Sequence, residues 1–109
     1  MVPAEGNTIS NGNIIDAAIS PGAATLTDTA FQPNRVNVKL GDSVRWANND
    51  NTLHTVIEGD PKTGQITGGF ASDIIGPKGT FEHKFEKVGA FNYYCKLHPN
   101  MIGKVVVVS

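Results

Sequence analysis

Residues 36–47 read VNVKLGDSVRWA. Apolar and polar side chains alternate at every second position on both sides of Gly41-Asp42, a turn sequence. A period of two places one set of side chains on one face of a strand, whereas a helix would need a period near 3.6. The stretch therefore predicts two β-strands joined by a tight turn.

Similar patterns predict strands elsewhere in the chain. Alternation recurs over residues 80–85 and 91–95, and a short strand is expected over 54–57. Residues 105–108 form a continuous apolar run, which is typical of a strand buried on both faces or of a closing strand at the core. No run of ten or more residues combines helical periodicity with capping residues. We therefore predict an all-β fold, a Greek-key β-sandwich of about eight strands.

Other parts of the chain are less regular. Residues 58–78 contain five glycines and two prolines, so we expect a long irregular connection there, with room for a short strand or a turn of helix inside it. At 109 residues the chain predicts a single domain, 1–109. Within it, residues 30–109 form the expected core, and residues 1–29 are a less regular N-terminal extension in which 13–19 forms an edge strand.

The composition excludes some classes of function. Nine basic and ten acidic side chains leave a net charge of −1, without the basic surface that nucleic-acid binding needs. No apolar stretch approaches the roughly 20 residues of a transmembrane helix. Residues 1–10 have neither a basic nor an apolar region and are not a signal peptide, so any secretion leader is expected to have been removed.

Three candidate metal ligands lie close together near the C-terminus, where residues 94–104 read YCKLHPNMIGK. Cys95 is the only cysteine of the chain, His98 follows it by three residues, and Met101 follows by three more. A thiolate, an imidazole and a weak thioether suit copper that cycles between Cu(I) and Cu(II). A second imidazole is needed, and His54, on the separate strand predicted over 54–57, is the candidate.

Other interpretations of these residues are weaker. Zinc sites use several cysteines or histidines, and methionine is a poor zinc ligand. A nucleophilic Cys/His pair is a further option, but Cys95 shares the inward face of its predicted strand with Phe91 and Tyr93, which suits a shielded ligand. Cys95 and Met101 could also be ordinary core residues. His83 lies between two phenylalanines on one strand face, so we expect it to pack there and not to bind metal.

The chain resembles the mononuclear blue, type 1 copper proteins, the cupredoxins, and in particular their plastocyanin and amicyanin types. The resemblance covers about residues 30–109, and the Cys-x2-His-x2-Met spacing is similar to the short amicyanin loop. Its main pieces, in order, are residues 31–33, 38–48, 50–56, 70–72, 79–81, 85, 89–95 and 98–107.

The resemblance implies a complete ligand set for one copper ion. His54, Cys95 and His98 would be the equatorial ligands and Met101 the axial ligand. Thr55 and Asn48 would lie around them.

Many relatives have asparagine after the first histidine, where its side chain ties the two ligand loops together. Thr55 stands at that position here. Its backbone N–H is expected to reach the Cys95 sulfur, and whether its side chain makes the tie is left open.

The resemblance also implies an electron carrier. Redox proteins would dock on an apolar surface near His98, lined by Leu97 and Pro99, and Tyr94 would offer a second, outward route for the electron. We expect a monomer in a periplasmic or other extracytoplasmic location. The alternative function is a copper redox enzyme that acts on a small molecule such as nitric oxide or nitrite through an open axial position. A copper module cut from a larger oxidase is a third interpretation.

Overall fold

The computed structural model describes residues 12–109, and it describes the side chains of all of these except residues 65–68. The expected absence of a signal peptide in residues 1–10 therefore concerns a segment outside the described residues. Within them the chain forms nine strands and one short 3₁₀ helix, with no α-helix. The elements are β2 (Ile14–Ile19), η1 (Ala23–Thr25), β3 (Phe31–Gln32), β4 (Arg35–Lys39), β5 (Ser43–Asn48), β6 (Ile57–Asp60), β7 (Gln65–Ala71), β8 (Thr80–Lys84), β9 (Gly89–Cys95) and β10 (His98–Val108).

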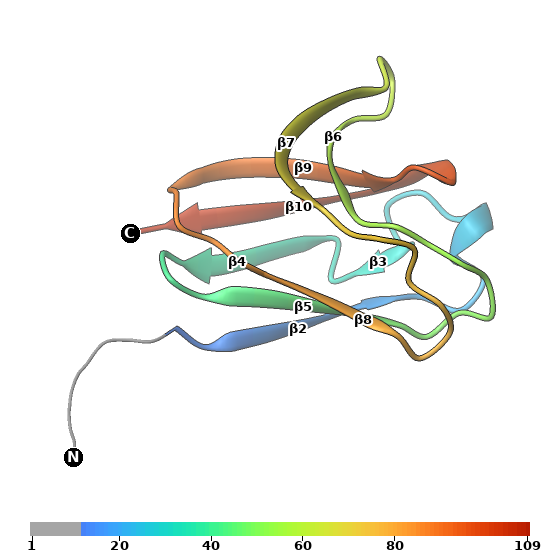
Figure 1. The fold of residues 1–109 in the computed structure, drawn as a ribbon, viewed down its shortest axis with the longest axis horizontal. Helices are drawn as coiled ribbons and strands as arrows, with labels where there is room; N and C mark the ends of the chain where they lie inside the picture. Colours follow the sequence, from blue (N-terminus) through green and yellow to red (C-terminus); the bar gives the residue numbers. More distant parts are fainter. Residues whose placement is uncertain (1–11) are drawn as a thin grey trace.

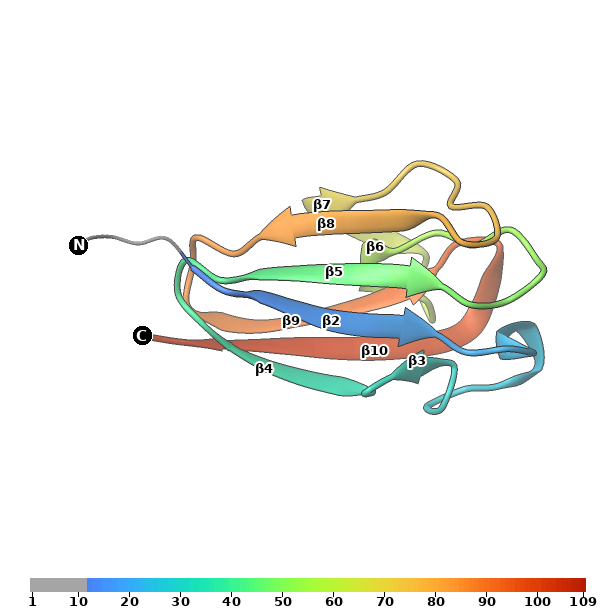
Figure 2. The same cartoon turned by 90° about the horizontal axis from the view of Figure 1, so that it is seen from below.

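The strands form two sheets that stack face to face (Figures 1 and 2). One sheet has the order β4-β10-β9-β6-β7 and the other has the order β3-β2-β5-β8. β10 pairs with β4 in parallel, as β2 does with β5, and the remaining pairs are antiparallel. The chain crosses between the sheets after β3, β4, β5, β7 and β8, so the predicted all-β sandwich is confirmed.

An aromatic cluster fills the space between the sheets. Trp46 is fully buried and stacks on Phe70 and Phe81, with ring centroids 5.8 and 5.7 Å apart. Its indole N–H donates to the hydroxyl of Tyr93 at 3.1 Å. Burial raises the pKa of Tyr93, so the hydroxyl stays protonated. This buried pair satisfies the indole donor inside the core.

The structure corrects the elements that were expected in the middle of the chain. The strand predicted over 54–57 begins only at Ile57, and His54 makes an isolated bridge before it. The irregular connection expected over 58–78 contains the β6–β7 hairpin. Its turn includes Gly64 at φ 70°, a left-handed conformation that glycine adopts without strain. Because these strands are rich in glycine, their alternation of apolar and polar side chains was too weak to recognise.

The expectation of an edge strand was wrong, and of the two alternatives for residues 105–108 the structure excludes burial on both faces. The predicted edge strand, β2, lies inside its sheet, with β3 on one side and β5 on the other. The apolar run at the end of β10 alternates in burial: Val105 and Val107 are buried, whereas Val108 is half-exposed. β10 therefore buries one face at this end, although its sequence has no polar positions there.

The β9–β10 turn and η1 lie together at one end of the sandwich, and the C-terminus lies at the other (Figure 1). The β4–β5 turn is also at the end that carries the C-terminus. Among residues 12–109 no helix has the length and apolar character needed to cross a membrane.

Candidate metal centre

A tight hairpin brings Cys95 and His98 together. Cys95 ends β9, His98 begins β10, and the two are register partners across a turn formed by Lys96 and Leu97. Side chains of residues directly opposite each other in an antiparallel pair lie on the same face. The Nδ1 atom of His98 consequently lies 3.7 Å from the Cys95 Sγ atom. The Cys-x2-His spacing is thus the spacing of a two-residue hairpin loop.

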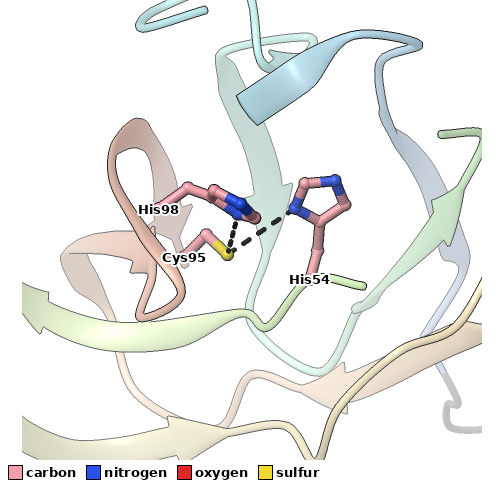
Figure 3. Close-up of side chains that lie close together, drawn as sticks. All are labelled: His54, Cys95 and His98. Carbon is pink, nitrogen blue, oxygen red and sulfur yellow. Dashed lines mark hydrogen bonds between the residues drawn. The ribbon is translucent and has the colours of Figure 1, made fainter. Parts of the chain in front are cut away.

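His54 comes from a separate segment of the chain, and its ring also points toward the Cys95 sulfur (Figure 3). Its backbone pairs with Ile75 through two hydrogen bonds of 3.1 and 2.7 Å, which fix the segment before β6. The His54 Nδ1 atom lies 3.7 Å from the Cys95 Sγ atom. The three ligand atoms of His54, Cys95 and His98 all lie within 4.8 Å of one another. The structure therefore assembles the predicted thiolate and two imidazoles.

These distances fit a metal ion in a trigonal site. Bonds of about 2.0 Å to nitrogen and about 2.3 Å to sulfur, at an angle of about 120°, separate the two donor atoms by about 3.7 Å. Both imidazole nitrogens stand at 3.7 Å from the sulfur. Cys95 and His54 are fully buried and His98 is partly exposed, so water reaches the set from one side only.

Met101 lies in an irregularity of β10. The register of β9 and β10 shifts between His98 and Ile102, which leaves three residues outside the ladder. The Met101 side chain is fully buried. The Asn100 side chain donates to the carbonyl oxygens of Ala24 and Leu26, at 3.0 and 2.8 Å. The bulge that carries Met101 is thereby anchored to the η1 segment.

Thr55 ties the two ligand-bearing segments together. Its backbone N–H donates to the Cys95 sulfur at 3.3 Å, as the sequence predicted. Its hydroxyl lies 3.8 Å from the same sulfur and accepts a hydrogen bond from the backbone N–H of Lys96 at 2.8 Å. The side-chain tie, left open from the sequence, is therefore made by threonine.

Asn48 supports His54 indirectly, at the end of β5. Its amide group donates to the carbonyl oxygens of Thr52 and Ile75, both at 2.9 Å, and its oxygen accepts from the backbone N–H of Asp50, also at 2.9 Å. Asn48 is fully buried, so these contacts hold the loop before His54 in a single arrangement.

No role was predicted for Asp50, although it begins one of the stretches that carry the family resemblance. Its Oδ2 atom lies 2.7 Å from the His54 Nε2 atom, and its Oδ1 atom accepts from the backbone N–H of Gly22 at 3.0 Å. The hydrogen bond with His54, followed by that with Gly22, lowers the pKa of Asp50. The spacing of four residues between Asp50 and His54 was the only available signal, and nothing in the sequence pointed to Gly22.

Tyr94 does not lie where the family resemblance put it. Its ring is 3% exposed, so it is buried and not an outward tyrosine. Tyr94 lies on the face of β9 opposite to Tyr93, between its register partners Ile57 and Ile102. β9 has β10 on one side and β6 on the other. The residues expected near a docking surface do reach solvent, since Leu97 and Pro99 are both exposed.

His83 packs as the sequence predicted. Its ring stacks on Phe70 with centroids 5.1 Å apart and meets the edge of Phe85 at 4.9 Å. Burial lowers the pKa of His83, against smaller opposing effects of Glu58 and Glu86. Among the described residues the one candidate metal cluster contains His54, Cys95 and His98 and leaves His83 out.

Comparisons with known proteins agree with this geometry. Residues 20–108 match the family of copper binding proteins described as the plastocyanin/azurin family. The chain is 37% identical over 81 residues to amicyanin-alpha of Methylorubrum extorquens, covering 71% of this chain and 63% of that protein. It is 32% identical over 86 residues to chloroplastic plastocyanin of Tetradesmus obliquus, covering 71% of this chain and 57% of that protein.

A solved structure described as a novel purple cupredoxin from Nitrosopumilus maritimus has a TM-score of 0.77 and 30% identity, covering 85% of this chain and 98% of that one. The matches span less than two thirds of the amicyanin-alpha and plastocyanin chains named above. The family match, in contrast, spans most of this chain and includes all four predicted ligands. The chain therefore belongs to the plastocyanin/azurin family of copper binding proteins.

Proposed function

We propose that His54, Cys95 and His98 hold a single copper ion and that Met101 is its axial ligand. Copper bound there would supply one-electron exchange between Cu(I) and Cu(II). The spacing of 3.7 Å from the sulfur to each imidazole nitrogen supports the three equatorial ligands. The full burial of Met101 in the bulge next to His98 supports the fourth.

We propose that the protein carries single electrons between redox partners. The observation that carries this proposal is the contrast in exposure among the ligands. Cys95 and His54 are fully buried, and His98 is the one ligand of the three that is partly exposed. The rigid hydrogen-bonded loops around Thr55 and Asn48 hold the donors in place, which keeps the rearrangement on electron transfer small. The buried Met101 side chain supports a carrier over an enzyme with an open copper position.

Replacing Met101 with leucine tests the axial ligand. We expect Met101→Leu to keep copper bound and to raise the reduction potential, because loss of a weak donor favours Cu(I) over Cu(II) while leucine keeps the site dry. Voltammetry of the copper-loaded protein measures the potential. An unchanged potential together with an unchanged optical spectrum would show that Met101 serves only as core packing.

Partners would dock around His98. Apolar side chains flank the ligands in the sequence, and several are well exposed: Leu97 is 46%, Leu53 48% and Ile74 59% exposed. Leu97 and Pro99 flank His98, Leu53 precedes His54, and Ile74 precedes the residue that bridges to His54. We propose that these side chains form an apolar docking surface through which the electron passes by way of His98.

Electron self-exchange between oxidised and reduced copies tests this docking surface. We expect Leu97→Glu to slow self-exchange at least about tenfold, since like charges then face each other across the encounter contact. The broadening of NMR signals in mixtures of both redox states measures the rate. Val88→Glu is the matched control, because Val88 is also exposed, at 57%, and lies in the turn before β9.

An equal slowing in both variants would mean that net charge, and not the His98 surface, controls the rate. Rapid consumption of nitrite or nitric oxide by the copper-loaded protein would contradict the carrier function itself.

We also propose that the protein works as a monomer in an extracytoplasmic compartment. The family resemblance supports this location, and a metal-bound thiolate is protected there from oxidation. Sedimentation of the copper-loaded protein and fractionation of the source cells test these two points.

A further inference from the structure

We propose that Asp50 is a positioning residue that fixes the ring of His54 toward the copper site and biases the site toward the oxidised state. The inference rests on the proposed copper site, because it concerns the second nitrogen of one of its ligands. Nothing in the family match assigns a role to this carboxylate.

The two ring nitrogens of His54 have different tasks. Nδ1 lies 3.7 Å from the Cys95 sulfur, whereas Nε2 lies 2.7 Å from the Asp50 Oδ2 atom. An ionised carboxylate only accepts hydrogen bonds, so the ring hydrogen must be on Nε2. The Nδ1 lone pair is then free and points to the position where the three donors meet. Asp50 thus sets both the tautomer and the direction of the ligand.

Asp50 is itself held in place. Its second oxygen, Oδ1, accepts from the backbone N–H of Gly22 at 3.0 Å, and its own N–H donates to the Asn48 side chain at 2.9 Å. Asp50 is 8% exposed and His54 is fully buried. A hydrogen bond between a charged group and its partner is stronger when water is excluded. The contact is therefore short, fixed and poorly screened.

The other imidazole lacks such a partner. His98 is partly exposed, and within residues 12–109 no group is hydrogen-bonded to its second ring nitrogen. The carboxylate is thus hydrogen-bonded to one of the two imidazoles, that of His54. A carboxylate on the far nitrogen raises the basicity of a ligating imidazole. A more basic ligand and a nearby negative charge both favour Cu(II) over Cu(I).

Asp50→Asn removes the charge while its amide oxygen still accepts from His54. We expect the Cu(II) affinity to fall about tenfold relative to the Cu(I) affinity, within the range known for outer ligand contacts. For a one-electron couple a tenfold change corresponds to a rise of about 59 mV in the reduction potential. In the Cu(I) protein, the NMR signal of the His54 Nε2 proton should move upfield, because its acceptor has become neutral.

Asp42 offers a matched control. It is also 8% exposed, and its two oxygens accept from the backbone N–H groups of Asn13 and Lys39, both at 2.9 Å. It lies at the β4–β5 turn, at the opposite end of the sandwich (Figure 1). Asp42→Asn should lower the melting temperature about as much as Asp50→Asn does, and should leave the reduction potential and the His54 signal unchanged.

The outcomes separate this inference from the proposed function. If the unmodified protein shows no intense thiolate-to-copper absorption band, the copper site itself is wrong. If that band is present but Asp50→Asn leaves the potential and the His54 proton unchanged, the positioning role of Asp50 is overturned. Equal shifts of the potential in Asp50→Asn and Asp42→Asn would also overturn it, since both would then act through general stability.

Discussion

Cys95→Ser is expected to abolish the visible absorption of the copper-loaded protein and to lower its Cu(II) affinity by more than about 100-fold. This exceeds the loss known for outer contacts of metal sites, because a ligand itself is removed. A serine hydroxyl is hard and stays protonated, so it cannot replace a soft thiolate. Cys95 is the only cysteine of the chain, and both imidazole nitrogens stand 3.7 Å from its sulfur. Titration with Cu(II), followed by absorption spectroscopy, measures both effects.

His83→Gln provides the control for this experiment. His83 contacts Phe70 and Phe85 and lies outside the cluster formed by the ligands. We expect this variant to keep the full absorption band. An intense band that survives in Cys95→Ser would exclude the thiolate as the ligand, and loss of copper from His83→Gln would exclude His54 as the second imidazole.

Gly103→Ala is expected to destabilise the folded protein by about 2 kcal/mol, in the range of an overpacked core. Gly103 of β10 is the register partner of Tyr93 in β9. An added Cβ atom would overlap the ring and the hydroxyl group of Tyr93. Moving the ring would disturb its edge-to-face contact with Phe31 and the hydrogen bond that its hydroxyl accepts from Trp46.

Chemical denaturation of the copper-free protein measures this loss, and Gly76→Ala is the control. A Cβ atom at Gly76 would meet only a side-chain atom of Leu53, at 3.9 Å, which is an ordinary contact. We expect a change within about 0.5 kcal/mol for that variant. Equal stabilities of the two alanine variants would mean that the Tyr93 ring is not locked in the core.

The sequence predicted the parts of the site that depend on local spacing. Cys95 and His98 meet because a two-residue turn makes them opposite partners, and their spacing in the sequence carries that information. The alternation over residues 36–47 predicted β4 and β5 for the same reason, since burial on one face imposes a period of two. The position of His54 followed from chemistry, because the ligand set needed a second imidazole.

The remaining features depend on contacts between distant segments. Asp50 is fixed by Gly22, and Asn100 is anchored to the carbonyl oxygens of Ala24 and Leu26. The segment around η1 therefore holds in place both Asp50 and the bulge that carries Met101. Residues 1–29 had been predicted only as an irregular extension with an edge strand. A backbone carbonyl or N–H group acts as a partner whatever its side chain, so no residue pattern identifies it.

The burial of Tyr94 also depends on contacts between distant segments, so it could not be predicted from the sequence. The alternation along β9 placed Tyr94 on the face opposite to Tyr93, which would be the exposed face of a sheet open to water. The ring lies between Ile57 and Ile102 instead, and it is 3% exposed. Ile57 is its partner because β6 pairs with β9, and the residue pattern of either strand does not show which side chains this pairing brings together.

The most direct test of the central claim is a redox-coupled copper titration of the unmodified protein. We expect an intense visible band from the thiolate to copper that saturates at one copper ion per chain. The band should disappear on one-electron reduction and return fully on reoxidation, with no other reactant consumed. Saturation without an intense band, or a band that does not return after reduction, would contradict a copper electron carrier built on His54, Cys95 and His98.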